Sequence, residues 1–511
     1  MALASFFDKA ALSAAALLRG FNRSAFEQKL IGVNVGIIFE NHAAKDSEQH
    51  VAIELLINLL ARLYPTLSLI CSDSGDILDE MRSLALRINP QIEIRTECVG
   101  LSAAVATVDS PLLDAVRDQC PVVYLGSNGW IAKVGTIGAM DWGRSQNTLG
   151  AAAAACLGAA NVFRHIFRDQ ISDPKLDENL ALSLFDYSTD PIQEDQPMLA
   201  PANLSGTTLI GAGAIGNAVI WALRRLSGVS GNLNVVDHES IELSNLQRYV
   251  LTDTNSVGLC KVNVVEQAMI DRELTVLTFA KKWSDHMECS DWNLPRLAVA
   301  VDTIQERINI SGALAKEVLN AWTQADEVGI SRHYKYGDEA CLSCLYFPDG
   351  RVPNEADLVG QAVGLPQENV LIRDLLQTGK PVDHSFLERV ATALGIPAKE
   401  IFAFEGKGLR QFYSEAICGG MVFRLGATAN TGTEVPMAFQ SALAGIFLAA
   451  EILMAASRTR SQAIPNTTRL RVSAAVSGSL LTPVAVVERC ICQDPDFRSV
   501  YQMKHGPINK T

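Results

Sequence analysis

A glycine-rich loop is the pattern in this chain that most directly indicates chemistry. Gly211, Gly213 and Gly216 have a GxGxxG spacing between an apolar run and a helical stretch, and Asp237 follows the apolar run 233–236. Such a turn lets backbone N–H groups and a helix N-terminus approach a phosphate, and an aspartate about twenty residues further on can accept hydrogen bonds from a ribose. The pattern predicts a nucleotide-binding βαβ unit.

The polar residues that follow distinguish ATP from a dinucleotide. Asn245, Arg248 and Lys261 suit a triphosphate, because they can stabilise the charge that develops when its α-phosphorus is attacked. Asp302 ends the run 299–301, where a parallel sheet opens its ligand crevice, and a carboxylate there suits Mg²⁺. Three other interpretations are a plain tight turn beside a solvated loop, a dinucleotide oxidoreductase and a non-catalytic scaffold. The ordered set as a whole favours ATP.

Four cysteines form two short pairs that are far apart in the chain, Cys341 with Cys344 and Cys490 with Cys492. Four thiolates from two such knuckles make a closed structural zinc site, which would tie the end of the chain to its middle. The alternative is a set of ordinary buried cysteines. The pattern favours Zn²⁺.

This segment resembles the adenylating domain shared by ubiquitin-activating enzymes and the MoeB and ThiF proteins of molybdopterin and thiamine synthesis. That family has a glycine loop, Asp-x-Asp, Ser-Asn-Leu-x-Arg, a lysine, an aspartate at a later strand end, and two CxxC pairs. Here Glu239 replaces the second aspartate, Tyr249 stands where a glutamine often follows the arginine, and the second cysteine pair is one residue shorter. The resemblance implies that ATP and Mg²⁺ are bound by Gly211, Gly213, Gly216, Asp237, Glu239, Asn245, Arg248, Lys261 and Asp302.

One further cysteine, Cys418, precedes two glycines and an apolar helix that carries Gln440 and Glu451. In the family, a crossing loop with a cysteine and glycines comes before such a helix, so Cys418 matches the residue that accepts the activated protein as a thioester. A thiolate is a strong nucleophile and a fair leaving group, which suits it to passing on an acyl group. The alternative is a small buried residue, and some family members adenylate without forming a thioester.

Residues 1–185 have an α/β pattern without a glycine loop. Strands are expected at 31–39, 67–70, 92–95 and 122–125, and helices at 48–62 and 147–168. This half resembles the inactive partner of paired or fused ubiquitin-activating enzymes, and an unrelated α/β domain is the alternative. Partner halves insert an arginine into the ATP site of the active half. Arg23 resembles that arginine, although a solvated helix end would give the same pattern.

The expected fold class is therefore α/β, with two Rossmann-like adenylation folds that form a pseudo-dimer within one chain. The first fold is inactive and the second is active. A linker is expected at 186–204, the ATP-binding domain at 205–350, a helical insertion with the cysteine loop at 351–420, and the rest of the domain with the second cysteine pair at 421–511.

Composition agrees with a cytoplasmic enzyme. Most of the 11 cysteines are scattered, which suits a reducing compartment, and no signal peptide is apparent at the start of the chain. The net charge of −13 argues against nucleic acid or an anionic membrane as the main partner. The apolar run 149–160 is too short to span a bilayer, and the run after 435 carries two polar residues. Both runs are expected to be buried helices.

The function expected from the resemblance is ATP-dependent activation of a ubiquitin-like protein. Its C-terminal carboxylate would be adenylated, moved to Cys418 as a thioester and passed to a conjugating enzyme. The fused architecture is similar to that of the activating (BilD-like) enzymes of bacterial antiphage ubiquitin-like operons, which is an analogy at the level of fold. The alternative within the family is a MoeB/ThiF-type enzyme that adenylates for sulfur transfer or peptide modification without a thioester.

Overall fold

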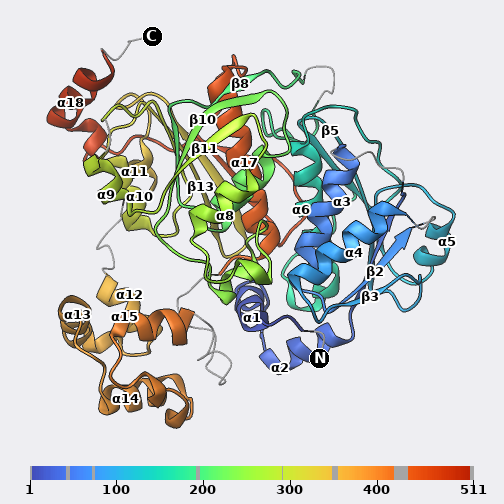
Figure 1. Ribbon diagram of the computed structural model, residues 1–511, viewed down its shortest axis with the longest axis horizontal. Helices are drawn as coiled ribbons and strands as arrows, with labels where there is room; N and C mark the ends of the chain where they lie inside the picture. Colours follow the sequence, from blue (N-terminus) through green and yellow to red (C-terminus); the bar gives the residue numbers. More distant parts are fainter. Residues whose placement is uncertain are drawn as a thin grey trace.

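The computed structural model describes residues 3–41, 47–71, 75–191, 196–289, 292–347, 355–418 and 435–506. Over these residues the chain forms two β-sheets flanked by helices, together with a small helical lobe (Figure 1). The first sheet and its helices lie on the right of Figure 1, the second sheet lies at the centre and left, and the lobe lies at the lower left.

The first sheet has seven strands in the order β3-β2-β1-β4-β5-β6-β7. Strands β1 to β5 are parallel, and β6 and β7 are added antiparallel at one edge. Its strands are β1 Asn34–Phe39, β2 Thr66–Cys71, β3 Glu93–Arg95, β4 Ala103–Ala106, β5 Val122–Asn128, β6 Ile131–Gly135 and β7 Asn179–Ser183. Its helices are α1 Phe7–Ala15, α2 Arg23–Ile31, α3 Glu48–Leu60, α4 Asp76–Ile88, α5 Leu112–Arg117 and α6 Leu149–Ile166. Each strand and helix predicted above for this half is confirmed, with small shifts at the ends.

The second sheet has the order β11-β10-β9-β12-β13-β14-β15-β16, with β8 paired to β10. Its strands are β8 Ala202–Asn203, β9 Thr207–Ile210, β10 Val229–Val236, β11 Leu274–Phe279, β12 Arg296–Val299, β13 Glu317–Gln324, β14 Glu327–His333, β15 Thr467–Arg471 and β16 Leu481–Thr482. Its helices are α7 Ala214–Leu223, α8 Lys261–Ala268, α9 Trp283–Cys289, α10 Ile304–Ser311, α11 Leu342–Leu345, α17 Ala438–Ser457 and α18 Pro495–His505. The prediction of a mixed α/β protein with parallel-rich sheets is confirmed.

The two sheets share one topology over seven strands, β1 to β7 in one and β9 to β15 in the other, and the second sheet adds β8 and β16. In each, five parallel strands follow the order 3-2-1-4-5, and antiparallel strands then extend the sheet beyond the fifth. A helix follows the first strand of each sheet, α3 in one and α7 in the other, and a long apolar helix precedes the seventh strand, α6 in one and α17 in the other.

These four helices join the two halves. Helix α3 packs on α6, α17 packs on α7, and α6 and α17 pack on each other. Helices α3, α6 and α17 lie near the centre of Figure 1. A β-carbon at Gly445 would lie 2.5 Å from both the Ala218 side chain and the Ile215 carbonyl oxygen. Glycine at 445 therefore allows α17 to approach α7 this closely.

A buried ionic cluster also joins the halves. Glu451 on α17 is fully buried and pairs with Arg332 on β14 and with Arg460, each at 2.9 Å. Its carboxylate also accepts a 2.8 Å hydrogen bond from the hydroxyl of Tyr187 in the linker, and Arg460 donates a 2.8 Å hydrogen bond to the carbonyl of Phe185, at the end of the first half. Because every partner is charged or polar, the cost of burying this carboxylate is offset.

The helical lobe lies between α11 and α17 in the chain. It contains α12 Glu355–Ala362, α13 Asn369–Thr378, α14 His384–Leu394, α15 Leu409–Phe412 and the π-helix η8 Tyr413–Cys418. Asp383 caps α14 by accepting a 2.7 Å hydrogen bond from the Phe386 N–H, which defines where this helix begins. The lobe has its own apolar core, centred on residues such as Ile372, Leu387 and Phe412.

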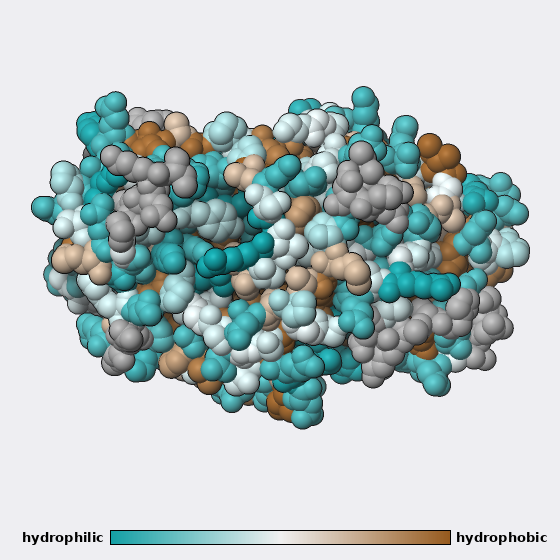
Figure 2. Space-filling view, turned by 90° about the horizontal axis from the view of Figure 1, so that it is seen from above, coloured by the Kyte–Doolittle hydropathy of each residue, from teal (hydrophilic) through white to brown (hydrophobic). Residues whose placement is uncertain are grey.

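Two helices, α6 and α17, are long and apolar enough to cross a membrane by length and composition. Each has 94% of its most apolar 18-residue window buried inside the protein. The face seen in Figure 2 mixes hydrophilic side chains with scattered apolar ones. Both helices are core helices of this fold, as the sequence predicted.

Candidate functional site

The glycine loop joins β9 to α7. Gly211 has a φ of +93°, and a β-carbon there would lie 2.7 Å from the Ala300 carbonyl oxygen. A β-carbon at Gly216 would lie 2.0 Å from the Gly211 carbonyl oxygen. Both positions therefore require glycine, and Gly213 is the N-cap of α7. The resulting turn points the helix N-terminus across the end of β9, which is the geometry of an anion site.

Asp237 links this loop to the next strand. It follows β10, and its carboxylate accepts hydrogen bonds from the Ala212 N–H and the Glu239 N–H, each at 2.8 Å. Strands β10, β9 and β12 are parallel neighbours, so the residues that follow them lie along one edge of the sheet. The glycine loop, Asp237 and Asp302 meet at this edge, as the sequence implied.

Lys261 begins α8 and is 5% exposed. Its ammonium hydrogen-bonds to the Glu239 carboxylate and lies 5.4 Å from the centre of the Tyr249 ring. Burial by itself would lower the pKa of Lys261, but Tyr249, Asp237 and Glu239 outweigh it and raise that pKa. Burial acts to raise the pKa of Glu239, and the Lys261 charge lowers it overall. Both groups are therefore charged and paired in the absence of a ligand.

Asn245 and Arg248 lie on and just after the short helix η3 Leu243–Gln247. The Asn245 side-chain oxygen accepts a 3.0 Å hydrogen bond from the Glu242 N–H, so it caps the helix. The Arg248 guanidinium contacts the Gln247 side-chain oxygen at 3.4 Å and lies 5.9 Å from the Tyr249 ring. Arg248 and Lys261 thus flank a single aromatic ring.

Asp302 is exposed and lies three residues beyond the end of the preceding strand β12. Thr303 caps α10 by accepting a 3.2 Å hydrogen bond from the Glu306 N–H, which brings a second carboxylate one helical turn after Asp302. Burial, followed by the charge of Asp302, raises the pKa of Glu306. The guanidinium of Arg307, the next residue, donates a hydrogen bond to the carbonyl of Val301, which precedes Asp302. Glu306 and Arg307 were not foreseen, although their four- and five-residue spacing from Asp302 is visible in the sequence.

Helix α3 of the first half supports the η3 segment. The Asn58 amide donates to the Val250 carbonyl at 2.9 Å, and the buried Arg62 guanidinium donates to the Thr252 carbonyl at 2.8 Å and to the Leu246 carbonyl. These bonds hold the loop that carries Asn245 and Arg248. No local sequence signal could have revealed them, because about 190 residues separate the partners.

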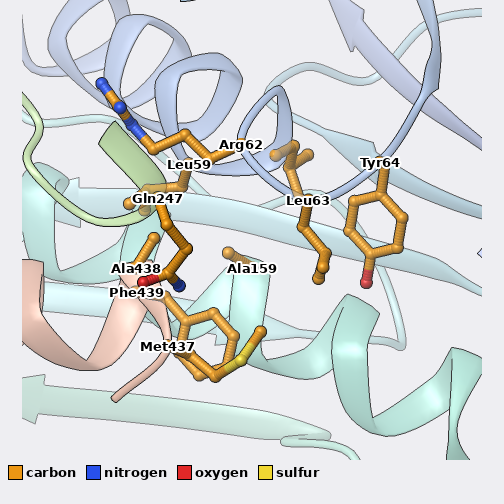
Figure 3. Close-up of a pocket in the computed structure, with 10 residues that line it drawn as sticks. Leu59, Arg62, Leu63, Tyr64, Ala159, Gln247, Met437, Ala438 and Phe439 are labelled. Atoms are coloured by element: carbon orange, nitrogen blue, oxygen red, sulfur yellow. The ribbon is translucent and has the colours of Figure 1, made fainter. Parts of the chain in front are cut away.

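A cavity lies behind this loop, at the junction of α3, α6, η3 and α17 (Figure 3). It is lined by Leu59, Leu60, Arg62, Leu63, Tyr64, Ala159, Gln247, Met437, Ala438 and Phe439. In Figure 3 the Arg62 guanidinium points away from the apolar side chains. The lining is mostly apolar and offers no set of phosphate-binding groups.

The corresponding edge of the first sheet is built differently. Asn41 comes shortly after β1, and its side-chain oxygen accepts a 3.3 Å hydrogen bond from the Ile77 N–H. The Trp142 indole and the Gln49 amide donate to the Thr107 carbonyl, at 2.7 Å and 3.3 Å. The sequence between β1 and α3 contains no glycine.

Arg23 starts α2 in the N-terminal segment. Its guanidinium pairs with Asp8 at 2.7 Å and with Glu27 at 2.9 Å, and it lies 5.3 Å from the Phe7 ring. Helix α1 packs against η3, so this segment adjoins the site loop, while both carboxylate partners of Arg23 belong to the segment itself. A role for Arg23 in the ATP site stays a prediction.

Cys418 is the last residue of η8. Its side chain and the following residues 419–434, which include Gly419 and Gly420, lie outside the residues that the structure describes. The assignment of Cys418 as the thioester residue therefore stays a prediction.

The four paired cysteines come together. Cys341 and Cys344 flank the start of α11, and Cys490 and Cys492 lie where the C-terminal segment folds back over it. Their sulfurs all lie within 4.8 Å of one another, with 3.5 Å between Cys341 and Cys490 and 3.5 Å between Cys344 and Cys492. A tetrahedron of sulfurs about 2.3 Å from Zn²⁺ has edges of about 3.8 Å, so this cluster fits that ion.

Comparison with known proteins identifies the family. Residues 196–481, more than half of the chain, match the ThiF family. The chain belongs to the ThiF family. Residues 38–168 match a second family, prokaryotic E2 family C. The ThiF match spans the whole second sheet and the glycine loop, and membership supports the adenylating chemistry expected from the sequence.

The chain is also similar to individual proteins. The chain is 41% identical over 512 residues to the uncharacterized protein y4jF of Sinorhizobium fredii, which covers 99% of this chain and 98% of that protein. It is 24% identical over 236 residues to the adenylyltransferase and sulfurtransferase UBA4 of Saccharomyces cerevisiae, covering 42% of this chain and half of UBA4. Escherichia coli MccB with ATP is a structural neighbour at 16% identity and a TM-score of 0.35, covering 57% of this chain and 66% of MccB.

Proposed function

We propose that this protein uses ATP to adenylate the C-terminal carboxylate of a ubiquitin-like protein and then carries the acyl group on Cys418. The observation on which the first step rests is the single sheet edge where the glycine loop, Asp237 and Asp302 meet, with Lys261 beside them. Membership of the ThiF family supports the same chemistry.

In the first step, the carboxylate oxygen attacks the α-phosphorus of ATP, the bond to the β-phosphate breaks, and pyrophosphate leaves with the electron pair. The N–H groups of the loop Gly211 to Gly216 and the start of α7 face the phosphates. Lys261 exchanges Glu239 for a phosphate oxygen, and Arg248 and Asn245 take further charge. Asp237 and Glu239 hold the ribose. Mg²⁺, when bound by Asp302, would neutralise charge on the departing pyrophosphate.

In the second step, the Cys418 thiolate attacks the carbonyl carbon of the adenylate. A sulfur–carbon bond forms, the bond to the phosphate oxygen breaks, and AMP leaves. A ubiquitin-conjugating-type enzyme then receives the acyl group. The match of residues 38–168 to a family named for prokaryotic E2 proteins supports a conjugation system. We propose that this system acts in the bacterial cytoplasm in defence against phages.

The two halves are proposed to be an inactive and an active adenylation fold paired in one chain. The identical strand orders and the matched helix pairs support this. The proposed divisions are 1–185, the linker 186–204, 205–350, 351–420 and 421–511. Asn41, Gln49 and Trp142 crowd the first edge, which fits an inactive half, and Arg23 contributes from the N-terminal segment.

A second candidate function is adenylation for sulfur transfer or peptide modification, in which Cys418 forms no thioester. The similarity to UBA4, an adenylyltransferase and sulfurtransferase, supports it. The two functions share the ATP site and differ only in the fate of the adenylate.

Exchange of labelled pyrophosphate into ATP tests the first step. Purified protein is given Mg²⁺, ATP and ubiquitin-like proteins from the same genome, one at a time. Exchange that depends on one of these proteins supports the proposal, and protein that does not bind ATP contradicts it. A thiol-sensitive adduct with that ubiquitin-like protein then separates conjugation from the second candidate.

A further inference from the structure

Tyr249 occupies one of the positions in the proposed ATP site where this chain departs from the family pattern, in which a glutamine often follows the arginine. The tyrosine as a whole is 3% exposed, but its hydroxyl is not among the fully buried polar atoms that lack a hydrogen-bond partner. The hydroxyl therefore lies at the open side of the residue, where a bound group can reach it. Its position indicates which group this is.

The hydroxyl lies against the glycine loop. A β-carbon built on Gly213 would lie 3.5 Å from it, which is van der Waals contact. Gly213 is the N-cap of α7, and a helix N-terminus favours anions. The hydroxyl oxygen is therefore within reach of a phosphate held by this loop.

The ring of the same residue contacts both cations of the site. The Lys261 ammonium lies 5.4 Å and the Arg248 guanidinium 5.9 Å from its centre, distances typical of cation–π contacts. When Lys261 leaves Glu239 for a phosphate, the ring still limits where its ammonium can move. One side chain thus supports the two cations and presents a donor between them and the glycine loop.

We propose that Tyr249 is a phosphate-binding residue of this enzyme, and that its hydroxyl donates a hydrogen bond to a phosphate oxygen of ATP. This inference rests on the proposed ATP site and adds a residue to it. The donor replaces the amide N–H that a glutamine would supply, so the chain keeps a neutral donor at this position and gains an aromatic ring for the cations.

Binding of Mg²⁺–ATP, AMP and adenosine to Tyr249→Phe tests the hydroxyl alone, because phenylalanine keeps the ring. We expect affinity for Mg²⁺–ATP to fall about 10- to 100-fold, the effect of losing a hydrogen bond to a charged group, and affinity for adenosine to be unchanged. Tyr249→Gln should restore most of the ATP affinity that Tyr249→Ala loses. Equal binding of Mg²⁺–ATP by wild type and Tyr249→Phe overturns the inference, and so does an equal loss for adenosine.

Tyr64→Phe is the matched control. Tyr64 is also buried, its hydroxyl lacks a partner in the described chain, and it borders the cavity of Figure 3 rather than the glycine loop. Its removal should leave all three affinities unchanged. If wild-type protein binds no ATP, the proposed function itself fails. If wild type binds ATP and Tyr249→Phe binds it equally well, only the role of Tyr249 fails.

Discussion

At the scale of single residues, the proposed ATP site holds Lys261 and Asp237 in hydrogen bonds before any ligand arrives. Lys261 is bonded to Glu239, and Asp237 is bonded to the N–H of the glycine loop. A triphosphate offers Lys261 a more highly charged partner than Glu239, so binding exchanges one ion pair for another. Such a preorganised site needs little rearrangement when charge develops on the phosphates.

Asp302→Ala tests the proposed metal-binding carboxylate. We expect the rate of ATP–pyrophosphate exchange to fall about 100-fold or more, because charge on the leaving pyrophosphate is no longer neutralised. The melting temperature should stay unchanged, since Asp302 is exposed. Asp114→Ala, an exposed aspartate of the first half, is the control and should exchange normally. Normal exchange by folded Asp302→Ala would contradict the site assignment.

Cys344→Ser tests the cysteine cluster. Wild-type protein should contain about one zinc per chain by elemental analysis, and the variant should lose both the metal and thermal stability, because a structural zinc site contributes directly to folding. Cys71→Ser, which changes a cysteine outside the cluster, should keep the zinc. Metal-free wild-type protein with full stability would show that the four residues are ordinary core cysteines.

At the scale of elements, the site depends on a helix from the other half. Helix α3 bonds the Leu246, Val250 and Thr252 carbonyls through Asn58 and Arg62. Arg62→Met should weaken ATP binding about tenfold and lower the free energy of unfolding by about 3 kcal/mol, because buried carbonyls lose their donors. Calorimetric binding and urea unfolding would measure the two effects. Arg225→Met removes a different contact between the halves, to Glu54, and should leave ATP binding unchanged.

The cysteine at the end of the helical lobe separates the two steps of the reaction. Cys418→Ala should keep ATP–pyrophosphate exchange with the ubiquitin-like protein, since the adenylate needs only the glycine-loop edge. The thiol-sensitive adduct on a non-reducing gel should disappear. Cys98→Ala should retain the adduct. If the adduct survives in Cys418→Ala, another cysteine is the acceptor, with Cys260 and Cys289 the next to substitute.

At the scale of the whole molecule, the features that could be predicted from the sequence are those that short segments encode in their residue pattern. The glycine spacing, the strand-end aspartates and the helices at 48–62 and 147–168 follow from turn geometry and apolar periodicity, which short segments carry. Arg62 was missed because its role arises only when distant segments pack, whereas Glu306 lies one helical turn after Asp302 and its spacing was visible in the sequence. Arg23 was assigned from a motif, and its pairing with Asp8 and Glu27 depends on how α1 and α2 meet. The strand order that the two halves share could likewise be recognised only from the strand pairing in the structure.

The Glu451 cluster links the halves and makes their pairing sensitive to acid. Burial acts to raise the pKa of Glu451, but the charges of Arg332 and Arg460 have the larger effect. The pKa is therefore lowered from its ordinary value of 4.5 to about 2. The contribution of Glu451 to the free energy of unfolding is therefore complete above about pH 4.5 and is lost as the pH falls towards 2.

Glu451→Gln should lower the free energy of unfolding by about 3–5 kcal/mol near neutral pH, since both arginines lose their buried partner. Urea unfolding at pH 7, 4 and 3 should show this deficit shrinking with acid. Glu355→Gln, which breaks an exposed pair with Arg410, should cost less than about 1 kcal/mol. A deficit of the same size at every pH would show that the Glu451 charge does not hold the halves together.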